Sequence, residues 1–170
     1  YQLSSVREVE GLFYDCPLET VYLGRNLSCE DNSSPSFSPF RASLKNLIIT
    51  GNVTSIPSYL FYYCTNLTSI IIPKSVSWIG EGAFYGCSLT SIVVEAGNTT
   101  YYSRDNCNAI IETNSNTLIK GCESTVIPKG VTSILASAFR GCSGLTSITI
   151  PESVISIGDY AFDNCTSLKE

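Results

Sequence analysis

LTSITIPESVISIGDYAFDNC, from Leu145 to Cys165, is the stretch that decides the fold, because versions of it recur along most of the chain. LTSIIIPKSVSWIGEGAFYGC (Leu67 to Cys87) and CESTVIPKGVTSILASAFRGC (Cys122 to Cys142) are the other strong copies. LKNLIITGNVTSIPSYLFYYC (Leu44 to Cys64) keeps the apolar positions but has Thr50 where the others have proline. Together the copies define the pattern L-x-x-I-x-I-P-x-x-V-x-x-I-G-x-x-A-F-x-x-C.

The copies start at a nearly constant spacing of 22 to 26 residues, with one spacing of 33 residues after Leu89. A period in the low twenties, headed by L-x-x-I-x-I, is typical of a leucine-rich repeat. One copy buries too little apolar surface to offset the cost of ordering its backbone, about 1–2 kcal/mol per residue, so the copies must stack on one another. We therefore predict one β-rich α/β domain over residues 1–170: a right-handed solenoid with a parallel sheet on one face and short turns or helices on the other. The starts are Leu18, Leu44, Leu67, Leu89, Cys122, Leu145 and Leu168.

Each repeat has a head and a tail with different local structure. The head has apolar residues two apart, which is typical of a short strand, and Pro73 or Pro151 ends it because proline cannot donate to a sheet. The tail, A-F-x-x-C, predicts a turn or short helix. Gly86 and Gly141 precede the final Cys, which indicates a left-handed residue at that position.

Glycine also stands in the middle of two repeats, at Gly80 and Gly158. The same position holds Pro57 and Leu135 in other repeats, so its φ must be negative. We therefore interpret glycine as allowed there but not required.

Two segments interrupt the repeat. The stretch from about residue 24 to 43, GRNLSCEDNSSPSFSPFRAS, is rich in Ser, Asn and Pro and predicts a loop in place of half a turn. An insertion from about residue 98 to 121 contains NAIIET and NTLIKG, two β-rich runs that flank Asn114 and Ser115 and predict a hairpin. The repeat continues on both sides of each interruption, which argues for a single domain.

The cysteines follow the repeat. The chain has eight, and five of them occupy the last position of a repeat, which predicts a column of buried free thiols; disulfides between them are the less favoured alternative. Cys107 and Cys122 lie at equal distances from the centre of the predicted hairpin and are the best candidates for a disulfide. Alternatively Cys122, which occupies the repeat position of Leu145, faces the core as a thiol. The five repeat cysteines are Cys16, Cys64, Cys87, Cys142 and Cys165.

Composition argues against several classes of function. The chain has no His, which excludes Ser-His-Asp and Cys-His catalysis and the mixed Cys/His zinc sites. The carboxylates have no convergent spacing, so we predict no enzyme, cofactor or metal site. A net charge of −5 without a basic stripe disfavours a nucleic-acid partner, and no apolar run reaches the roughly 18 residues of a membrane span. Because the chain starts without Met and stops just after a new repeat begins, we expect it to be part of a longer protein.

The heads predict an exposed apolar column. In L-x-x-I-x-I the apolar positions face the core, and the positions between them face outward from the sheet. The outward position between the last two apolar residues carries mostly large apolar side chains, and exposed apolar bands often mark interaction sites. The alternative is that β-branched residues are there because they suit a parallel sheet. The column consists of Tyr22, Ile48, Ile71, Val93, Val126 and Thr149.

The interruptions supply further candidate binding residues, because long insertions in a regular scaffold tend to carry function. Tyr101, Tyr102 and Arg104 lie in the insertion, and Phe37 and Phe40 lie in the early loop. For Phe40 an equally acceptable interpretation is that it fills the core where half a turn is missing.

LTSITIPESVISIGDYAFDNC, IPKSVSWIGEGAFYGC and VIPKGVTSILASAFRGC resemble the BspA-type leucine-rich repeats of bacterial surface proteins from gut and oral anaerobes. LETVYLGRN and SRDNCNAIIETNSNTLIKGCESTVIP resemble further segments of such proteins. The resemblance implies an extracellular or cell-surface array, with some members acting as adhesins, and brings no catalytic residues. We expect a non-enzymatic recognition or adhesion module that binds proteins or glycans through a concave sheet face or the inserted loops. The alternative is a passive spacer in a multidomain surface protein.

Overall fold

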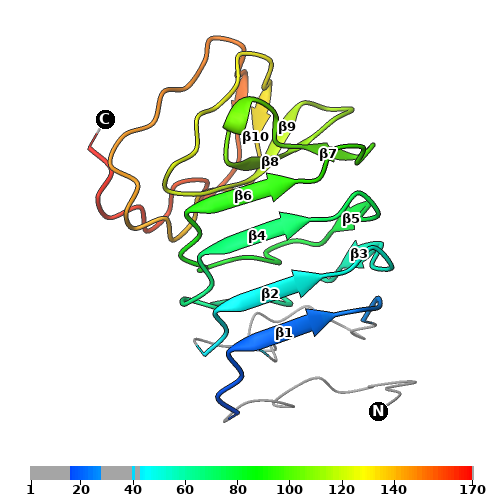
Figure 1. Ribbon diagram of the computed structural model, residues 1–170. Helices are drawn as coiled ribbons and strands as arrows, with labels where there is room; N and C mark the ends of the chain where they lie inside the picture. The colour runs from blue at the N-terminus through cyan, green and yellow to red at the C-terminus, as the bar shows by residue number, and fades with distance from the viewer. Residues whose placement is uncertain (1–15, 28–39, 41–42, 170) are drawn as a thin grey trace.

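The computed structural model describes residues 16–27, 40 and 43–169. Figure 1 shows four strands stacked in chain order like the rungs of a ladder, here called the first row. Within it β1 pairs with β2 and β4 pairs with β6, in both cases in parallel. Each strand is the head of one repeat, so the predicted solenoid with parallel strand pairing is confirmed. The strands are β1 (Thr20–Leu23), β2 (Asn46–Ile49), β4 (Ser69–Ile72) and β6 (Ser91–Val94).

A second row of two-residue strands follows the turn after each head, which contains proline in every repeat of the row except the one that begins at Leu44. It contains β3 (Ser55–Ile56), β5 (Trp78–Ile79), β10 (Ser133–Ile134) and β11 (Ser156–Ile157). β3 pairs in parallel with β5, and β10 with β11, so that equivalent isoleucines lie in register. The V-x-x-I half of the repeat therefore also stacks coil on coil, where a coil is one repeat of the solenoid.

The tails form a third stacked row, built of turns. Alternate N–H groups of one tail donate to carbonyls of the next, as Phe61 does to Ala83 at 2.9 Å and Phe139 to Ala161 at 2.8 Å. Short turns or helices were predicted on this face, and the described residues form turns there. The helical segment among the described residues is the 3-10 turn η2 (Arg104–Asn106), which lies in the insertion. The tails are turns because each contains two left-handed residues, a conformation that ends a helix. One set is the position before Cys, as predicted; the other, missed from the sequence, is Tyr59, Gly82, Ser137 and Tyr160.

Glycine is required at two places where coils approach closely. A Cβ at Gly80 would lie 2.3 Å from the backbone N of Ser58 in the preceding coil, and one at Gly158 would lie 2.4 Å from the N of Ala136. The prediction that glycine is merely tolerated there was wrong. The constraint comes from the neighbouring coil and not from φ, so the residue's own repeat position does not reveal it.

The insertion folds as predicted into a hairpin, but it is built into the solenoid. β8 (Ala109–Glu112) and β9 (Thr117–Gly121) pair antiparallel, and β7 (Tyr101–Tyr102) pairs antiparallel with β8. On its other edge β9 pairs in parallel with β10, which gives a five-stranded sheet in the order β11-β10-β9-β8-β7. The hairpin therefore takes the place of one regular coil.

Stacked phenylalanines run through the core on both sides of the insertion. Phe40 stacks on Phe61 and Phe61 on Phe84, with ring centroids 5.6 and 5.4 Å apart, and Phe139 stacks on Phe162 at 5.0 Å. Phe40 is thus a core residue, in agreement with the interpretation that it fills the missing half turn. The described buried residues form two clusters, one from Leu23 to Cys122 and one from Cys107 to Ala161.

The repeat cysteines form no disulfides, as predicted, and Cys64, Cys87 and Cys142 are buried. The prediction that the whole column is buried was wrong at its two ends, because Cys16 is exposed and Cys165 is half-buried. The repeat cysteines also serve as hydrogen-bond donors. The thiol of Cys87 donates to the carbonyl of Phe61 at 3.1 Å, and that of Cys165 to the carbonyl of Phe139 at 3.2 Å. The thiol therefore satisfies a carbonyl of the previous coil as well as filling space.

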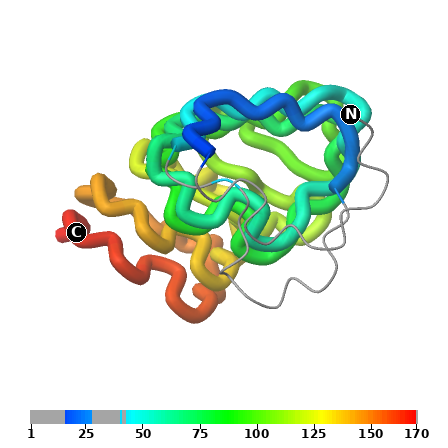
Figure 2. Tube along the Cα trace, turned by 90° about the horizontal axis from the view of Figure 1, so that it is seen from below, coloured from blue at the N-terminus to red at the C-terminus, as the bar shows by residue number. Residues whose placement is uncertain are grey.

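The last coils do not lie directly over the earlier ones. Figure 2 looks along the stack, and the chain coloured orange to red runs to one side of the ring formed by the preceding coils. The insertion separates these two regions along the sequence and in space.

Candidate functional site

The first row presents four of the six predicted column residues side by side. Tyr22 lies opposite Ile48 in the β1–β2 pair, and Ile71 lies opposite Val93 in the β4–β6 pair. The exposed fractions of these four side chains range from 40% for Ile48 to 74% for Tyr22. The residues on either side of Ile71, Ile70 and Ile72, are buried. We call these four residues the column face: Tyr22, Ile48, Ile71 and Val93.

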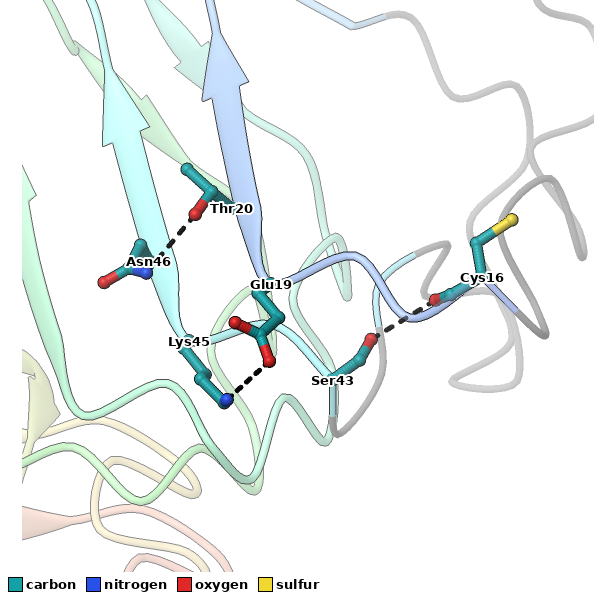
Figure 3. Close-up of polar contacts among 6 residues, drawn as sticks. All are labelled: Cys16, Glu19, Thr20, Ser43, Lys45 and Asn46. Atoms are coloured by element: carbon teal, nitrogen blue, oxygen red, sulfur yellow. Dashed lines mark hydrogen bonds and ion pairs between the residues drawn. The ribbon is translucent and has the colours of Figure 1, made fainter.

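Polar side chains border the column face at the start of β1 and β2 (Figure 3). Lys45 Nζ lies 2.6 Å from Glu19 Oε1, and Asn46 Nδ2 donates to Thr20 Oγ1 at 3.3 Å. Thr20 is two residues before Tyr22, so the two side chains point to the same side of the strand. An apolar centre with a polar border is the usual arrangement of a protein-binding surface.

The other two column residues lie apart from the column face. Val126 is exposed, as predicted, and its N–H donates to the carbonyl of Cys107 in the insertion at 3.1 Å. The N–H of Val94 at the end of β6 likewise donates to Ser103 Oγ in the insertion at 2.7 Å. Residues of the insertion therefore take hydrogen bonds both from β6 and from the segment that contains Val126. Val126 and Thr149 instead line a separate cavity of about 370 Å³.

Tyr101 is buried, in contrast to its prediction as a loop residue for binding. Its exposed fraction is 5%, and its hydroxyl oxygen accepts the N–H of Ile79 at 3.1 Å. Burial raises the pKa of this hydroxyl above its usual range. Tyr101 therefore connects the insertion to β5 and presents little surface to a protein partner.

Tyr102 and Arg104 remain on the surface of the insertion. The Arg104 guanidinium lies 4.7 Å from the centroid of the Tyr102 ring, and the Tyr102 hydroxyl donates to Asn116 Oδ1 at 3.3 Å. Tyr102 is half-buried and Arg104 is exposed, so the pair is a small cation–π patch. Phe37, the remaining candidate, lies outside the described residues.

Cys107 and Cys122 are free thiols, so the candidate disulfide is not formed. The alternative agrees with the structure, because Cys122 is a thiol in the buried core. The turn of the hairpin is centred as expected, with Glu112 opposite Thr117, but the register shifts between Ile110 and Ile111. Beyond this bulge Ala109 pairs with Gly121, so that Cys122 comes opposite Asn108. Its thiol donates to the Asn108 carbonyl at 3.3 Å.

A column of tail residues was missed from the sequence. Tyr62, Tyr85, Arg140 and Asp163 each follow the repeat phenylalanine, and this shared position was the available signal. The Arg140 guanidinium lies 5.2 Å from the centroid of the Tyr85 ring, and its Nε lies 2.9 Å from Asp163 Oδ2. Arg140 therefore links the coils before and after the insertion. Burial raises the pKa of the Tyr85 hydroxyl, and Arg140 opposes that rise.

The described residues contain no group of three or more His, Cys, Asp or Glu side chains placed to hold a metal ion. No helix in the described part of the chain has the length and apolar character needed to cross a bilayer.

Comparison with protein families identifies the repeat. A family model for the BspA type leucine rich repeat region matches residues 4–111 and 110–170, in six copies. The chain belongs to this family. None of the curated proteins compared with the chain matches its sequence.

Two solved structures share the fold of this BspA-type protein. A leucine rich cell surface protein from Faecalibacterium prausnitzii is 31% identical, with a TM-score of 0.70 over 93% of this chain and 42% of that one. The pneumococcal vaccine antigen PcpA is 24% identical, with a TM-score of 0.72 over 90% of this chain and 38% of that one. The chain thus spans less than half the length of either protein.

Proposed function

We propose that this chain is a non-enzymatic recognition module at a bacterial cell surface, which binds a protein partner through the column face. The observation that supports the proposal most is the outward exposure of Tyr22, Ile48, Ile71 and Val93 on adjacent strands. Family membership supports the surface location, because the related protein from F. prausnitzii is described as a cell surface protein.

The column face is suited to binding because its side chains are already held in place. Large apolar side chains held on a rigid sheet lose little conformational freedom when a partner covers them, and aromatic anchors such as Tyr22 contribute strongly at interfaces. The sheet does not need these residues for its core, because Ile70, Ile72 and Ile92 supply the buried side. In a passive spacer, these residues would be present only because they suit a parallel sheet.

The test is binding by variants of the column face. Wild-type chain and the triple variant Tyr22→Asp, Ile48→Asp and Ile71→Asp are passed over immobilised extracellular-matrix proteins, host glycans and bacterial surface extracts, with binding followed by surface plasmon resonance. We expect saturable binding to a protein and at least a tenfold loss of affinity in the triple variant. The matched control is Ile155→Asp, an apolar residue that is 87% exposed and lies away from the column face.

Each outcome separates the competing functions. Equal binding by the wild type and the triple variant would reject the column face as the binding site. Binding to glycans alone would reject a protein partner. No binding by the wild type to any probe would favour the spacer, with the column retained because β-branched residues pair well in a parallel sheet.

A further inference from the structure

A cluster of tyrosines lies on the tails of the two coils before the insertion. The ring of Tyr62 contacts those of Tyr59, Tyr63 and Tyr85, with ring centroids 5.9, 4.6 and 6.2 Å apart. Tyr63 is 51% exposed, and the other three are half-buried. A contiguous exposed patch of this kind often marks a binding site. We call these four residues the tyrosine cluster.

Tyr63 occupies a position where the backbone disfavours tyrosine. Its φ is 56°, in the left-handed region, and the equivalent residues of later repeats are Gly86, Gly141 and Asn164, which are types that adopt this conformation readily. The fold needs no aromatic side chain at this position, since those three repeats have none there. Backbone strain that the fold does not require is characteristic of functional sites.

The ring of Tyr63 lies against the backbone of the next coil. A Cβ at Gly86 would lie 3.0 Å from both Cγ and Cδ2 of this ring and 3.2 Å from Cδ1, so one face of the ring covers the glycine. About half of Tyr63 nevertheless stays exposed. The ring of Tyr62 stands beside it at an interplanar angle of 61°. The two rings therefore form a corner with an aromatic floor and one aromatic wall.

Two hydroxyl groups belong to this corner. The hydroxyls of Tyr62 and Tyr63 have no hydrogen-bond partner in the part of the chain that the structure describes. A tyrosine hydroxyl can both donate and accept a hydrogen bond. The corner therefore offers a ligand aromatic surface together with uncharged groups of both hydrogen-bonding kinds.

Charge around the tyrosine cluster disfavours an anionic ligand. Burial and then the neighbouring Glu81 carboxylate raise the pKa of the Tyr59 hydroxyl. A cation also lies beside the cluster: the Arg140 guanidinium is 5.2 Å from the centroid of the Tyr85 ring, but its Nε already pairs with Asp163 Oδ2 at 2.9 Å. The chain as a whole carries a net charge of −5. A neutral ligand avoids this repulsion.

We propose that the tyrosine cluster binds a neutral oligosaccharide, with one pyranose ring stacked on Tyr63. A pyranose with equatorial hydroxyls has apolar C–H groups on its faces, which pack on an aromatic ring, and hydroxyls around its edge, which bond to the hydroxyls of Tyr62 and Tyr63. A proline-rich peptide also packs on tyrosines, but it docks in an aromatic-lined groove. The ring contact of Tyr63 in the described part of the chain is with Tyr62, so the second wall of such a groove is missing.

This site lies on the tails, whereas the column face lies on the heads, so its occupancy does not depend on the protein-binding function proposed above. The test titrates the full chain with cellotriose and chitotriose, whose ring hydroxyls and amides are equatorial, and separately with a proline-rich peptide. Calorimetry gives the affinity, and saturation-transfer NMR shows which ligand protons lie against the protein. We expect saturable binding of at least one trisaccharide, with the strongest transfer to C–H protons of one ring face. No saturable binding of either trisaccharide, or binding of the peptide as tight as that of the sugar, would overturn the proposal.

Variants show whether the tyrosine cluster holds the sugar. Tyr63→Asn introduces the residue type that the last complete repeat has at this position, so we expect the variant to fold and to lose at least tenfold in sugar affinity. Tyr62→Phe keeps the ring and removes one hydroxyl, and a smaller loss of about threefold is expected. The matched control is Tyr160→Ala, because Tyr160 is an exposed tyrosine at the repeat position of Tyr59. Thermal unfolding confirms that each variant is folded. Unchanged affinity in Tyr63→Asn, or an equal loss in Tyr160→Ala, would contradict the assigned site.

Discussion

The coils before the insertion and the coils after it have the same motif but differ in their first row. Before the insertion, the heads pair as strands, β1 with β2 and β4 with β6, and Ile72 is fully buried. After it, the segments around Val126 and Thr149 form no strand pair. At the repeat position of Ile72, Ile127 is still buried, whereas Ile150, in the last complete coil, has an exposed fraction of 37%. The second row and the tails stack in both regions. The motif therefore specifies what a coil can bury, and the neighbouring coil determines what it does bury.

The largest expected difference between the regions lies in the phenylalanine stack. Phe61 lies between Phe40 and Phe84 and is fully buried, as is Phe139 after the insertion, whereas Phe162 in the last complete coil is half-buried and stacks on Phe139. We expect Phe61→Ala to lower the free energy of unfolding by about 3–5 kcal/mol and Phe162→Ala by roughly half of that. Urea denaturation measures both. Equal losses would show that the ring of Phe162, in the last complete coil, supports its core as much as the ring of Phe61 does.

The second prediction concerns the pH dependence that a buried cysteine after the insertion imposes. Burial raises the pKa of the Cys142 thiol to about 11, above its usual value of 9.0. Between these two pH values the unfolded chain loses the proton while the folded chain keeps it, so stability falls as the pH rises. The loss should total about 2–3 kcal/mol by pH 11, with no effect below pH 9.

The measurement is the unfolding free energy of the wild type and of Cys142→Ala at several pH values from 8 to 11. The difference between the two curves should be constant up to pH 9 and then shrink as the wild type loses stability. A constant difference over the whole range would contradict a buried protonated thiol. Cys16→Ala, at an exposed cysteine, is the control.

The third prediction tests whether the coils of the second row stack equally closely before and after the insertion. Gly80→Ala and Gly158→Ala each place a Cβ against the backbone of the preceding coil, and overpacking of this kind costs about 1–3 kcal/mol. The control is Gly130→Ala, because a Cβ there meets nothing within 4 Å. Thermal unfolding of the three variants gives the comparison. If Gly158→Ala behaved like Gly130→Ala, close stacking of the second row would be confined to the region before the insertion.

These glycines also show which features of the fold could be predicted from the sequence and which could not. The period predicts the solenoid, and the two β-rich runs predict the hairpin with its turn at the right place, because both follow from local patterns. The bulge at Ile110 and Ile111 has no such local pattern, so the disulfide between Cys107 and Cys122 was predicted from a register that the strand does not keep. The contact of Gly80 with Ser58 likewise depends on two coils at once.

The candidate sites divide in the same way. The column face is predictable because outward positions of a strand follow directly from its alternation, and four of its six expected members lie on the first row. The cavity of about 510 Å³ beside Gly82 and Ser137 was not predictable, because it lies where the insertion supplies no tail between two coils. Lys120 lies in a β-rich run, and alternation alone does not show that its Nζ is buried.

The smallest expected changes in the free energy of unfolding come from two ion pairs, one before the insertion and one after it. The side chains of Lys45 and Glu19 are both more than half exposed, so Lys45→Ala should cost at most about 0.5 kcal/mol. Arg140 pairs with Asp163 and also lies over the rings of Tyr85 and Tyr160, so Arg140→Ala should cost about 1 kcal/mol.

Added salt should remove the loss of stability caused by Lys45→Ala, because exposed charges are screened. It should reduce the effect at Arg140 less, because packing on the aromatic rings remains. If salt removed both effects equally, Arg140 would act as a charge alone, and its contact with Tyr85 would not hold together the coils on either side of the insertion.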